Sequence, residues 1–252
     1  MIKIFTISDL HLEFYKSDKS FFTNIKDKLV KADILILAGD IGYPDKHYAT
    51  HYLHLLQSFK QIYPYVILVP GNHEYYTTKN YNIIEQQEKL SKICNDAGVI
   101  LLNNSSVNIN NIKFIGTTLW SQINNKAFDS MNDKNNIFKN AKDYNDEHKK
   151  CVEWLKQEII NSENDDKIII ITHHLPTFKL CHPKFENNYI NSGFYTEILH
   201  DLNIKDNVKY WIAGHTHEYI NTKINNINFI INPMGYPYEN RDTLISYEPF
   251  II

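Results

Sequence analysis

Uninterrupted runs of β-branched and aliphatic residues recur along the chain, separated by amphipathic and polar stretches. Five of these runs predict strands, over Ile2 to Ile7, Ile34 to Ala38, Tyr65 to Val69, Ile168 to Ile171 and Val208 to Ala213. Continuous apolar runs of this length suit a sheet covered on both faces, because neither face then meets water. We therefore expect buried strands at the centre of the fold.

Apolar residues at helical spacing fill several of the intervals between these strands. Helices are predicted over Phe21 to Val30, His47 to Ile62, Tyr81 to Asn95 and Asp146 to Ile160. The regular alternation of strand and helix in the N-terminal part is typical of a layered α/β fold.

From Val99 onward the pattern changes to strands joined by asparagine-rich turns. Val107 to Ile109 and Ile112 to Thr117 flank Asn110-Asn111, and Ile220 to Ile224 and Ile227 to Ile231 flank Asn225-Asn226. Asparagine tolerates the left-handed backbone of tight hairpin turns, so both segments predict hairpins. We expect them in a second sheet packed against the first.

Residues 124–145 are polar and show little aliphatic periodicity. A chain of 252 residues suits one domain, so we expect a single domain over 1–252. The polar segment is a possible cap or lid over a site, and a solvated surface insertion is an equally open interpretation.

Charge and cysteine content restrict the binding partners and the cellular compartment that we expect. The formal net charge is −3 and Arg241 is the only arginine, so the chain lacks the basic field that long nucleic acids or anionic membranes require. No apolar run approaches the roughly 20 residues that cross a bilayer. Cys94, Cys151 and Cys181 are far apart, which fits a reducing, cytoplasmic setting.

Metal-binding side chains follow each of the five predicted strands. The blocks are Asp9-Leu10-His11, Gly39-Asp40, Gly71-Asn72-His73-Glu74, Thr172-His173-His174 and Gly214-His215-Thr216-His217. Open α/β sheets bind ligands at the carboxyl ends of their strands, so these side chains are expected to meet. Carboxylate, amide and imidazole donors without thiolates suit Mn, Fe, Zn or Mg.

The spacing inside the blocks has a geometric interpretation. Residues two apart on an extended chain point the same way, which would let Asp9 and His11 grip one ion, and likewise His215 and His217. A glycine before a ligand allows a sharp turn and a close approach of the backbone.

Together these blocks resemble the calcineurin-like metallophosphoesterase family, over Asp9 to His217. The resemblance implies a four-layer α/β/β/α sandwich of two mixed sheets flanked by helices. It also implies two divalent metal ions about 3.5 to 4 Å apart. One ion would be held by Asp9, His11 and His217, and the other by Asn72, His173 and His215. Asp40 would bridge the two ions.

The activity that the resemblance implies is hydrolysis of a phosphoester by a metal-bridging hydroxide. His73 is the candidate acid for the leaving group or a donor to a phosphate oxygen. For Glu74 we prefer a helix cap over a role in orienting an imidazole. Protein phosphatases of the family carry arginines where this chain has Ile41-Gly42-Tyr43 and Val69-Pro70, so that branch is disfavoured.

Two choices remain at the level of single residues. The residues alone do not distinguish His173 from His174 as the ligand, and the family resemblance favours His173; we expect the other to contact substrate or to support the site. Tyr75, Trp120 and Tyr236 are candidate substrate contacts, although aromatic residues more often belong to a core.

Phosphodiester or nucleotide-type substrates are favoured over monoesters, because no arginine clamp lies near the blocks. Two alternatives stay open: a nuclease acting on short oligonucleotides, and a non-catalytic protein-interaction scaffold on the same fold. A purely structural metal fits less well, since such sites are usually closed and rich in cysteine.

Overall fold

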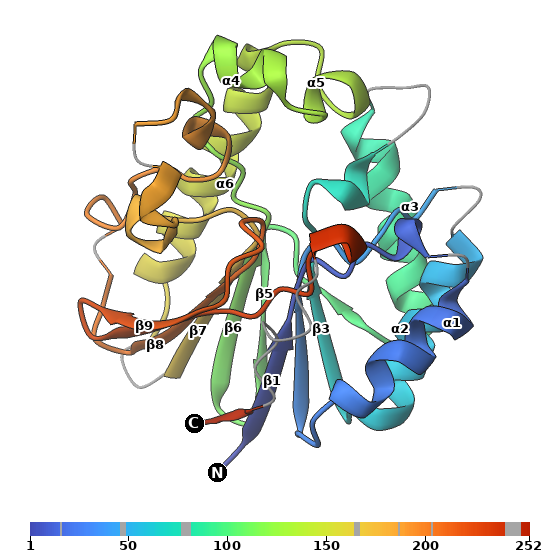
Figure 1. The fold of residues 1–252 in the computed structure, drawn as a ribbon. Helices are drawn as coiled ribbons and strands as arrows, with labels where there is room; N and C mark the ends of the chain where they lie inside the picture. Colours follow the sequence, from blue (N-terminus) through green and yellow to red (C-terminus); the bar gives the residue numbers. More distant parts are fainter. Residues whose placement is uncertain are drawn as a thin grey trace.

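The computed structural model describes residues 1–15, 17–45, 49–76, 82–163, 167–185, 187–202, 204–239 and 248–252. Arg241 and the predicted helix starts at His47 and Tyr81 lie outside these ranges. Two mixed β-sheets stand between layers of helices, and both chain ends lie at the edge of the sheets opposite helices α4 and α5 (Figure 1). The predicted fold class is confirmed.

The first sheet has the strand order β11-β1-β2-β3-β4. Its strands are β1 (Lys3–Ile7), β2 (Ile34–Ala38), β3 (Tyr65–Val69), β4 (Ile100–Leu101) and β11 (Phe250–Ile251). Neighbours from β1 to β4 pair in parallel, and β11 joins β1 antiparallel. Parallel pairing places the ends of β1, β2 and β3 at one edge.

The second sheet has the order β5-β6-β7-β8-β10-β9. Its strands are β5 (Ser105–Ile109), β6 (Ile112–Thr117), β7 (Lys167–Thr172), β8 (Val208–Ala213), β9 (Ile220–Ile224) and β10 (Ile227–Ile231). Strands β6, β7, β8 and β10 run parallel. The outer strands β5 and β9 are each the first arm of a predicted hairpin and pair antiparallel with β6 and β10. The turn residues Asn110, Asn111, Asn225 and Asn226 all have positive φ, as predicted.

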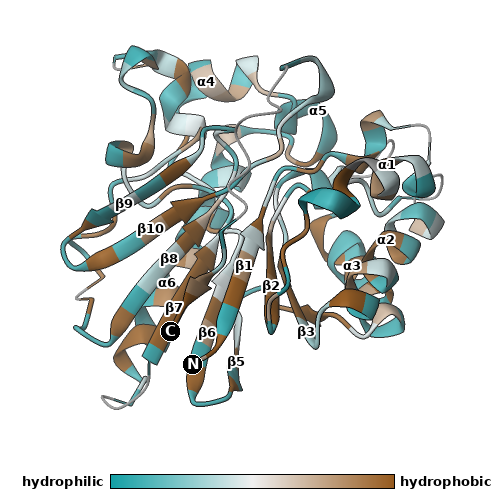
Figure 2. Cartoon of the chain, turned by 60° about the horizontal axis from the view of Figure 1, so that its bottom comes forward, coloured by the Kyte–Doolittle hydropathy of each residue, from teal (hydrophilic) through white to brown (hydrophobic). Residues whose placement is uncertain are grey.

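Alternating side chains of the inner strands divide the core into layers. In β2, Leu35 and Leu37 pack with the helices of the first half, whereas Ile34 and Ile36 pack between the two sheets. Strand β7 alternates in the same way between the inter-sheet core and the far helix layer. Hydrophobic residues accordingly concentrate along the strands of both sheets (Figure 2). This explains why the strands read as continuous apolar runs.

The helices are α1 (Asp18–Ile25), α2 (Ala49–Ile62), α3 (Ile83–Ala97), α4 (Asn125–Ser130), α5 (Asp133–Asn136) and α6 (Ala141–Ile160). Short 3-10 turns are η1 (Leu12–Phe14), η2 (Lys26–Lys28), η3 (His73–Tyr75), η4 (Phe178–Leu180), η5 (Pro183–Phe185), η6 (Tyr189–Gly193) and η7 (Pro237–Glu239). Helices α1, α2 and α3 lie beside the first sheet and α6 beside the second (Figure 1). Nowhere in the described part of the chain is a helix apolar and long enough to span a bilayer.

Two predicted helix starts were wrong, and the first helix ends at Ile25 rather than Val30. The first helix begins at Asp18 rather than Phe21, because the Ser17 hydroxyl accepts from the Ser20 N–H at 3.2 Å and caps it. The last begins at Ala141 rather than Asp146, because the Asn140 side chain accepts from the Asp143 N–H at 2.9 Å. The polar segment 124–145 therefore contains α4, α5 and the first turn of α6.

Candidate metal centre

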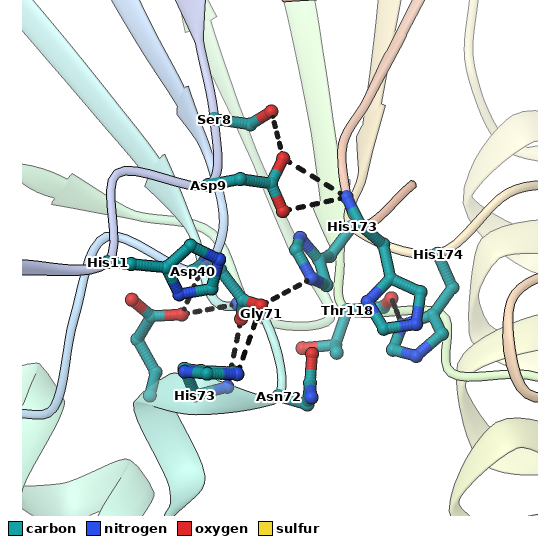
Figure 3. Close-up of polar contacts among 12 residues, drawn as sticks. Ser8, Asp9, His11, Asp40, Gly71, Asn72, His73, Thr118, His173 and His174 are labelled. Carbon is teal, nitrogen blue, oxygen red and sulfur yellow. Dashed lines mark hydrogen bonds and ion pairs between the residues drawn. The ribbon is translucent and has the colours of Figure 1, made fainter. Parts of the chain in front are cut away.

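All seven predicted ligands lie just beyond strand ends, and the structure brings them together. Figure 3 shows five of them: Asp9, His11, Asp40, Asn72 and His173. The Asp9 carboxylate accepts from the backbone N–H of His215 at 3.0 Å. His173 Nε2 lies 3.3 Å from Asp40 Oδ2, and His11 Nε2 lies 3.0 Å from His217 Nε2. Contacts therefore run across both sheets, from residues at the start of the chain to residues near its end.

Six of the seven predicted ligands fall into two adjoining donor groups. One contains Asp9, His11 and His217, and the other contains Asp40, His173 and His215. Within each group the potential ligand atoms lie within 4.8 Å of one another. A third such group, His11, Glu13 and His73, shares His11 with the first, and Asn72 lines the cavity beside them.

The backbone geometry at the ligands differs from the predicted extended alternation. Asp9 and His11 have φ values of 54° and 51°, and His215 and His217 have values of 71° and 52°. The paired residues therefore face the site from left-handed turns rather than from an extended strand. Left-handed backbone is unfavourable for residues with a Cβ and is enriched at functional sites.

The glycines before the ligands provide the expected close approach. Gly39 has a φ of 87°, and a Cβ at this position would lie 2.7 Å from the backbone nitrogen of Gly71. A Cβ at Gly71 would collide with the carboxylate of Asp40. Neither position accepts a larger residue without moving a candidate ligand.

Hydrogen bonds fix the orientation of three imidazole rings. His173 Nδ1 donates to the Ala38 carbonyl at 2.9 Å, His217 Nδ1 to Glu239 at 2.9 Å, and His11 Nδ1 to Glu13 at 3.2 Å. With Nδ1 engaged as a donor, Nε2 is the ring nitrogen left to face the site. This arrangement is typical of histidines that bind metal.

His174 has a different environment from its neighbour. Its Nδ1 lies 3.3 Å from the Thr118 carbonyl and its Nε2 lies 3.1 Å from the Tyr144 hydroxyl. The ring is fully buried and packs 4.1 Å from the His215 ring, measured between centroids. Burial and the neighbouring His215 hold the pKa of His174 well below its usual value. Both ring nitrogens are used by the protein, so the contacts do not support a substrate contact by His174.

His73 lies beside the donor groups with its Nδ1 donating to Glu13 Oε1 at 2.7 Å. Its Nε2 lies 3.8 Å from Asp40 Oδ2, and its ring stacks on Tyr76 at 4.4 Å. Burial opposes protonation, but the negative charges of Asp40 and Glu13 outweigh it and raise the pKa of His73 to about 9. His73 can therefore hold a proton near the centre.

Glu74 does not cap a helix, contrary to the preferred prediction. Its buried carboxylate accepts from the backbone N–H groups of Asp40 at 2.9 Å and Gly71 at 2.6 Å. It also accepts from the N–H groups of Ile41 and Gly42 and from the Tyr52 hydroxyl. Glu74 thus ties the turn after β2 to the turn after β3, and these turns carry Asp40 and Asn72.

A cavity of about 550 Å³ opens over the donor groups. Its walls include candidate centre residues and the rim residues Met131, Lys184, Phe185, Ile190 and Phe194. Tyr236 lines it and stacks on His11 at 4.3 Å, and its contact with substrate stays a prediction. Tyr75 and Trp120 instead lie in an aromatic cluster with exposed fractions of 2% and 1%, outside the cavity wall. Their predicted role as substrate contacts is therefore not supported.

Three residues that contact the centre were not predicted from the sequence. Glu13 bridges two imidazoles, Glu239 orients His217, and Asp133 accepts from Asn72. Glu13 continues the alternation of Asp9 and His11, which was a usable signal. Asp133 and Glu239 lie in polar stretches that carry no comparable pattern.

Two buried atoms test whether the centre fits a metal. Asn72 Oδ1 has no hydrogen-bond partner among the residues that the structure describes, and His173 Nε2 has only its ion-pair contact with Asp40 Oδ2 at 3.3 Å. Buried polar atoms rarely lack a partner, and each of these belongs to a side chain of the centre. Their oxygen and nitrogen chemistry, with the nearby carboxylates, fits a divalent cation.

The fold and the donor groups define an α/β protein with His and Asp clusters that can hold metal at the strand ends. The sequence model of the calcineurin-like phosphoesterase family matches residues 2–219, and the chain belongs to this family. It is 32% identical over 265 aligned residues to "Uncharacterized protein L509" of Acanthamoeba polyphaga mimivirus, covering 94% of this chain and 92% of that protein.

Solved structures show the same fold. The phosphopantetheinyl hydrolase PptH from Mycobacterium tuberculosis is similar with a TM-score of 0.73 and 19% identity, covering 99% of this chain and 95% of that one. A dimetal phosphatase from Danio rerio has a TM-score of 0.53 and 14% identity, covering 91% of this chain and 86% of that one. Both likenesses concern the fold.

Proposed function

We propose that this protein is a metal-dependent phosphodiesterase with a dinuclear centre. The observation that carries the proposal is the pair of adjoining donor groups, which open together onto one cavity. Family membership supports hydrolysis of phosphoesters as the reaction class.

Asp9, His11 and His217 would hold one ion, and Asn72, His173 and His215 the other, with Asp40 between them. When bound, such ions lower the pKa of water and neutralise charge on the phosphoryl group. The protein contributes preorganised ligands: the turns that carry Asp40 and Asn72 are linked through Glu74, and the Asp9 carboxylate is held by the N–H of His215.

His73 is the proposed proton donor to the leaving oxygen. Its Nδ1 is engaged by Glu13, so Nε2 is the atom that faces the cavity and can deliver a proton. The Tyr76 ring stacked on His73 limits rotation of the imidazole. Positioned acids of this kind contribute about 10²- to 10⁴-fold to a rate.

The cavity wall supports a diester over a monoester. Lys184 is its single described lysine and lies 3.5 Å from Glu218, and no arginine belongs to the described wall. A monoester brings a second negative charge that this wall does not match, whereas a diester replaces that charge with a second ester substituent. The apolar side chains Met131, Phe185, Ile190 and Phe194 form a surface for such a substituent.

Hydrolysis of paired aryl esters tests the proposal. Chelator-treated protein is titrated with Mn²⁺ and assayed on bis-p-nitrophenyl phosphate and on p-nitrophenyl phosphate. We expect Mn²⁺-dependent turnover of the diester, with kcat/KM at least about tenfold above that of the monoester. Asp40→Asn serves as the inactive control.

The outcomes separate the candidate functions. Preference for the monoester would reject the diester assignment while keeping a phosphoesterase. Two bound ions without hydrolysis of either ester or of a short oligonucleotide would favour a non-catalytic scaffold on this fold.

A further inference from the structure

A buried carboxylate from the α4–α5 segment reaches into the metal centre. Asp133 is the first residue of α5 and has no exposed surface. Its Oδ1 accepts hydrogen bonds from Asn72 Nδ2 at 3.0 Å and from the Tyr76 hydroxyl at 2.8 Å. Asp133 follows the cavity-wall residues Ser130, Met131 and Asn132 directly in the chain.

These contacts decide which end of the Asn72 amide faces the centre. The NH₂ group donates to Asp133 and to Tyr76, whose hydroxyl lies 3.2 Å away. The carbonyl Oδ1 is left buried with no hydrogen-bond partner in the described part of the chain, and it does not cap η3. An asparagine has one end that can bind a cation and one that repels it.

The same carboxylate also acts on His73 through Tyr76. The Tyr76 hydroxyl donates to Asp133, and the Tyr76 ring stacks on His73 with an angle of 24° between the planes. One acceptor atom therefore fixes the amide of a candidate ligand and the aromatic partner of the candidate acid.

The α4–α5 segment is itself anchored on the opposite wall of the cavity. Asn124 Nδ2 donates to Ser192 Oγ at 2.7 Å and to the Tyr189 carbonyl at 3.1 Å, both in η6. In addition, Met131 packs so closely on Gly193 that a Cβ at position 193 would collide with its sulfur. The segment thus bridges from η6 to Asn72 above the strand ends (Figure 1).

We propose that Asp133 is a positioning residue that orients Asn72 for cation binding and makes the α4–α5 segment a structural part of one ion site. This inference rests on the proposed dinuclear centre. It gives the polar segment that contains α4 and α5 a function in the metal centre. Without Asp133, the Asn72 amide would be free to turn its NH₂ group toward the ion.

Mn²⁺ binding, measured by calorimetry and by metal analysis after desalting, tests the inference without reference to activity. In Asp133→Ala we expect one of the two sites to lose about 10- to 100-fold in affinity. The matched control is Asp129→Ala, which removes an exposed carboxylate of the same segment that pairs with Lys134, and it should bind as the unaltered protein does.

A second substitution separates orientation from general structure. Asn72→Asp, added to Asp133→Ala, provides a side chain whose two ends are both oxygen, so Mn²⁺ binding should recover to within about threefold. Failure of this rescue, or unchanged binding in Asp133→Ala, would overturn the inference.

Two further outcomes are informative. If Asp133→Ala does not fold, the double variant Asn72→Asp with Asp133→Asn, which conserves volume, tests the inference instead. We expect this double variant to bind two ions. A folded double variant that binds only one ion would reject the inference. If the unaltered protein binds two Mn²⁺ without hydrolysing any ester, the proposed function fails while the role of Asp133 stands.

Discussion

Glu13 Oε1 accepts a hydrogen bond from His73 Nδ1 at 2.7 Å, and the same oxygen lies 3.2 Å from His11 Nδ1. One carboxylate oxygen therefore orients a candidate ligand and the candidate acid together. The hydrogen bonds to His11 and His73 outweigh burial and keep the pKa of Glu13 below its usual value, so the carboxylate stays charged. Negative charge at this position favours the protonated form of His73.

Glu13→Gln should slow the enzyme most on esters with poor leaving groups. Glutamine can still accept from His73 but lacks the charge that favours protonation, so proton delivery weakens while the ring stays in place. We expect kcat to fall about tenfold for phenyl esters and less than about threefold for p-nitrophenyl esters, whose leaving group hardly needs a proton.

Metal analysis is the control for this variant, because Glu13 also contacts His11. Two bound ions together with a leaving-group-dependent loss support the role of Glu13 toward His73. An equal loss on both esters would contradict it.

The raised pKa of His73 makes the stability of the metal-free protein depend on pH. A histidine whose pKa rises from 6.5 to about 9 on folding stabilises the folded state fully below pH 6.5, and this contribution disappears as the pH rises through about 9. The shift corresponds to roughly 3 kcal/mol.

Denaturant unfolding of chelated His73→Gln and unaltered protein measures this contribution. The difference between their unfolding free energies should shrink by roughly 3 kcal/mol from about pH 6 to about pH 10. His200→Gln, at an exposed position, should give no such trend. A constant difference for His73→Gln would show that its imidazole is not protonated in the fold.

Much of the fold was predictable because the apolar runs directly report burial on both faces. Strands β1, β2, β3, β7 and β8 were expected within one or two residues of their observed ends, and the blocks after them meet in space. The reason given for Asp9 and His11 was nevertheless wrong: positive φ values, not strand alternation, aim both side chains inward. The alternation of side chains along an extended strand does not predict such strained turns.

What could not be predicted depends on contacts between distant segments. Asp133 lies 61 residues after Asn72 and meets it only because α4 and α5 fold over the strand ends. Tyr75 and Trp120 were chosen for their nearness in sequence to ligand blocks, yet both belong to the aromatic cluster. Sequence proximity does not determine whether an aromatic ring faces a cavity or a core.

Glu74→Gln should strongly destabilise the protein. An amide must turn its NH₂ group toward backbone N–H donors of Asp40, Gly71, Ile41 or Gly42, which leaves buried donors unpaired. We expect a loss of roughly 3 kcal/mol and a fall of about 10 °C in Tm, measured by thermal unfolding followed by circular dichroism. Glu88→Gln, on the exposed side of α3, is the control. A Tm within about 2 °C of the unaltered protein would show that Glu74 does not hold the two turns together.

The adjacent histidines after β7 should respond in opposite ways to substitution by alanine. His173 presents Nε2 to Asp40 at 3.3 Å, so His173→Ala should lose about 10- to 100-fold or more in Mn²⁺ affinity and nearly all hydrolysis. His174 has both nitrogens engaged, by Thr118 and Tyr144, so His174→Ala should retain two ions. Its cost is structural: removing a buried ring that packs on His215 should lower stability by roughly 2 kcal/mol. Metal analysis and thermal unfolding of the two variants side by side measure both effects. Loss of Mn²⁺ in His174→Ala with retention in His173→Ala would reverse the ligand assignment, because an ion is lost only when a side chain that binds it is deleted.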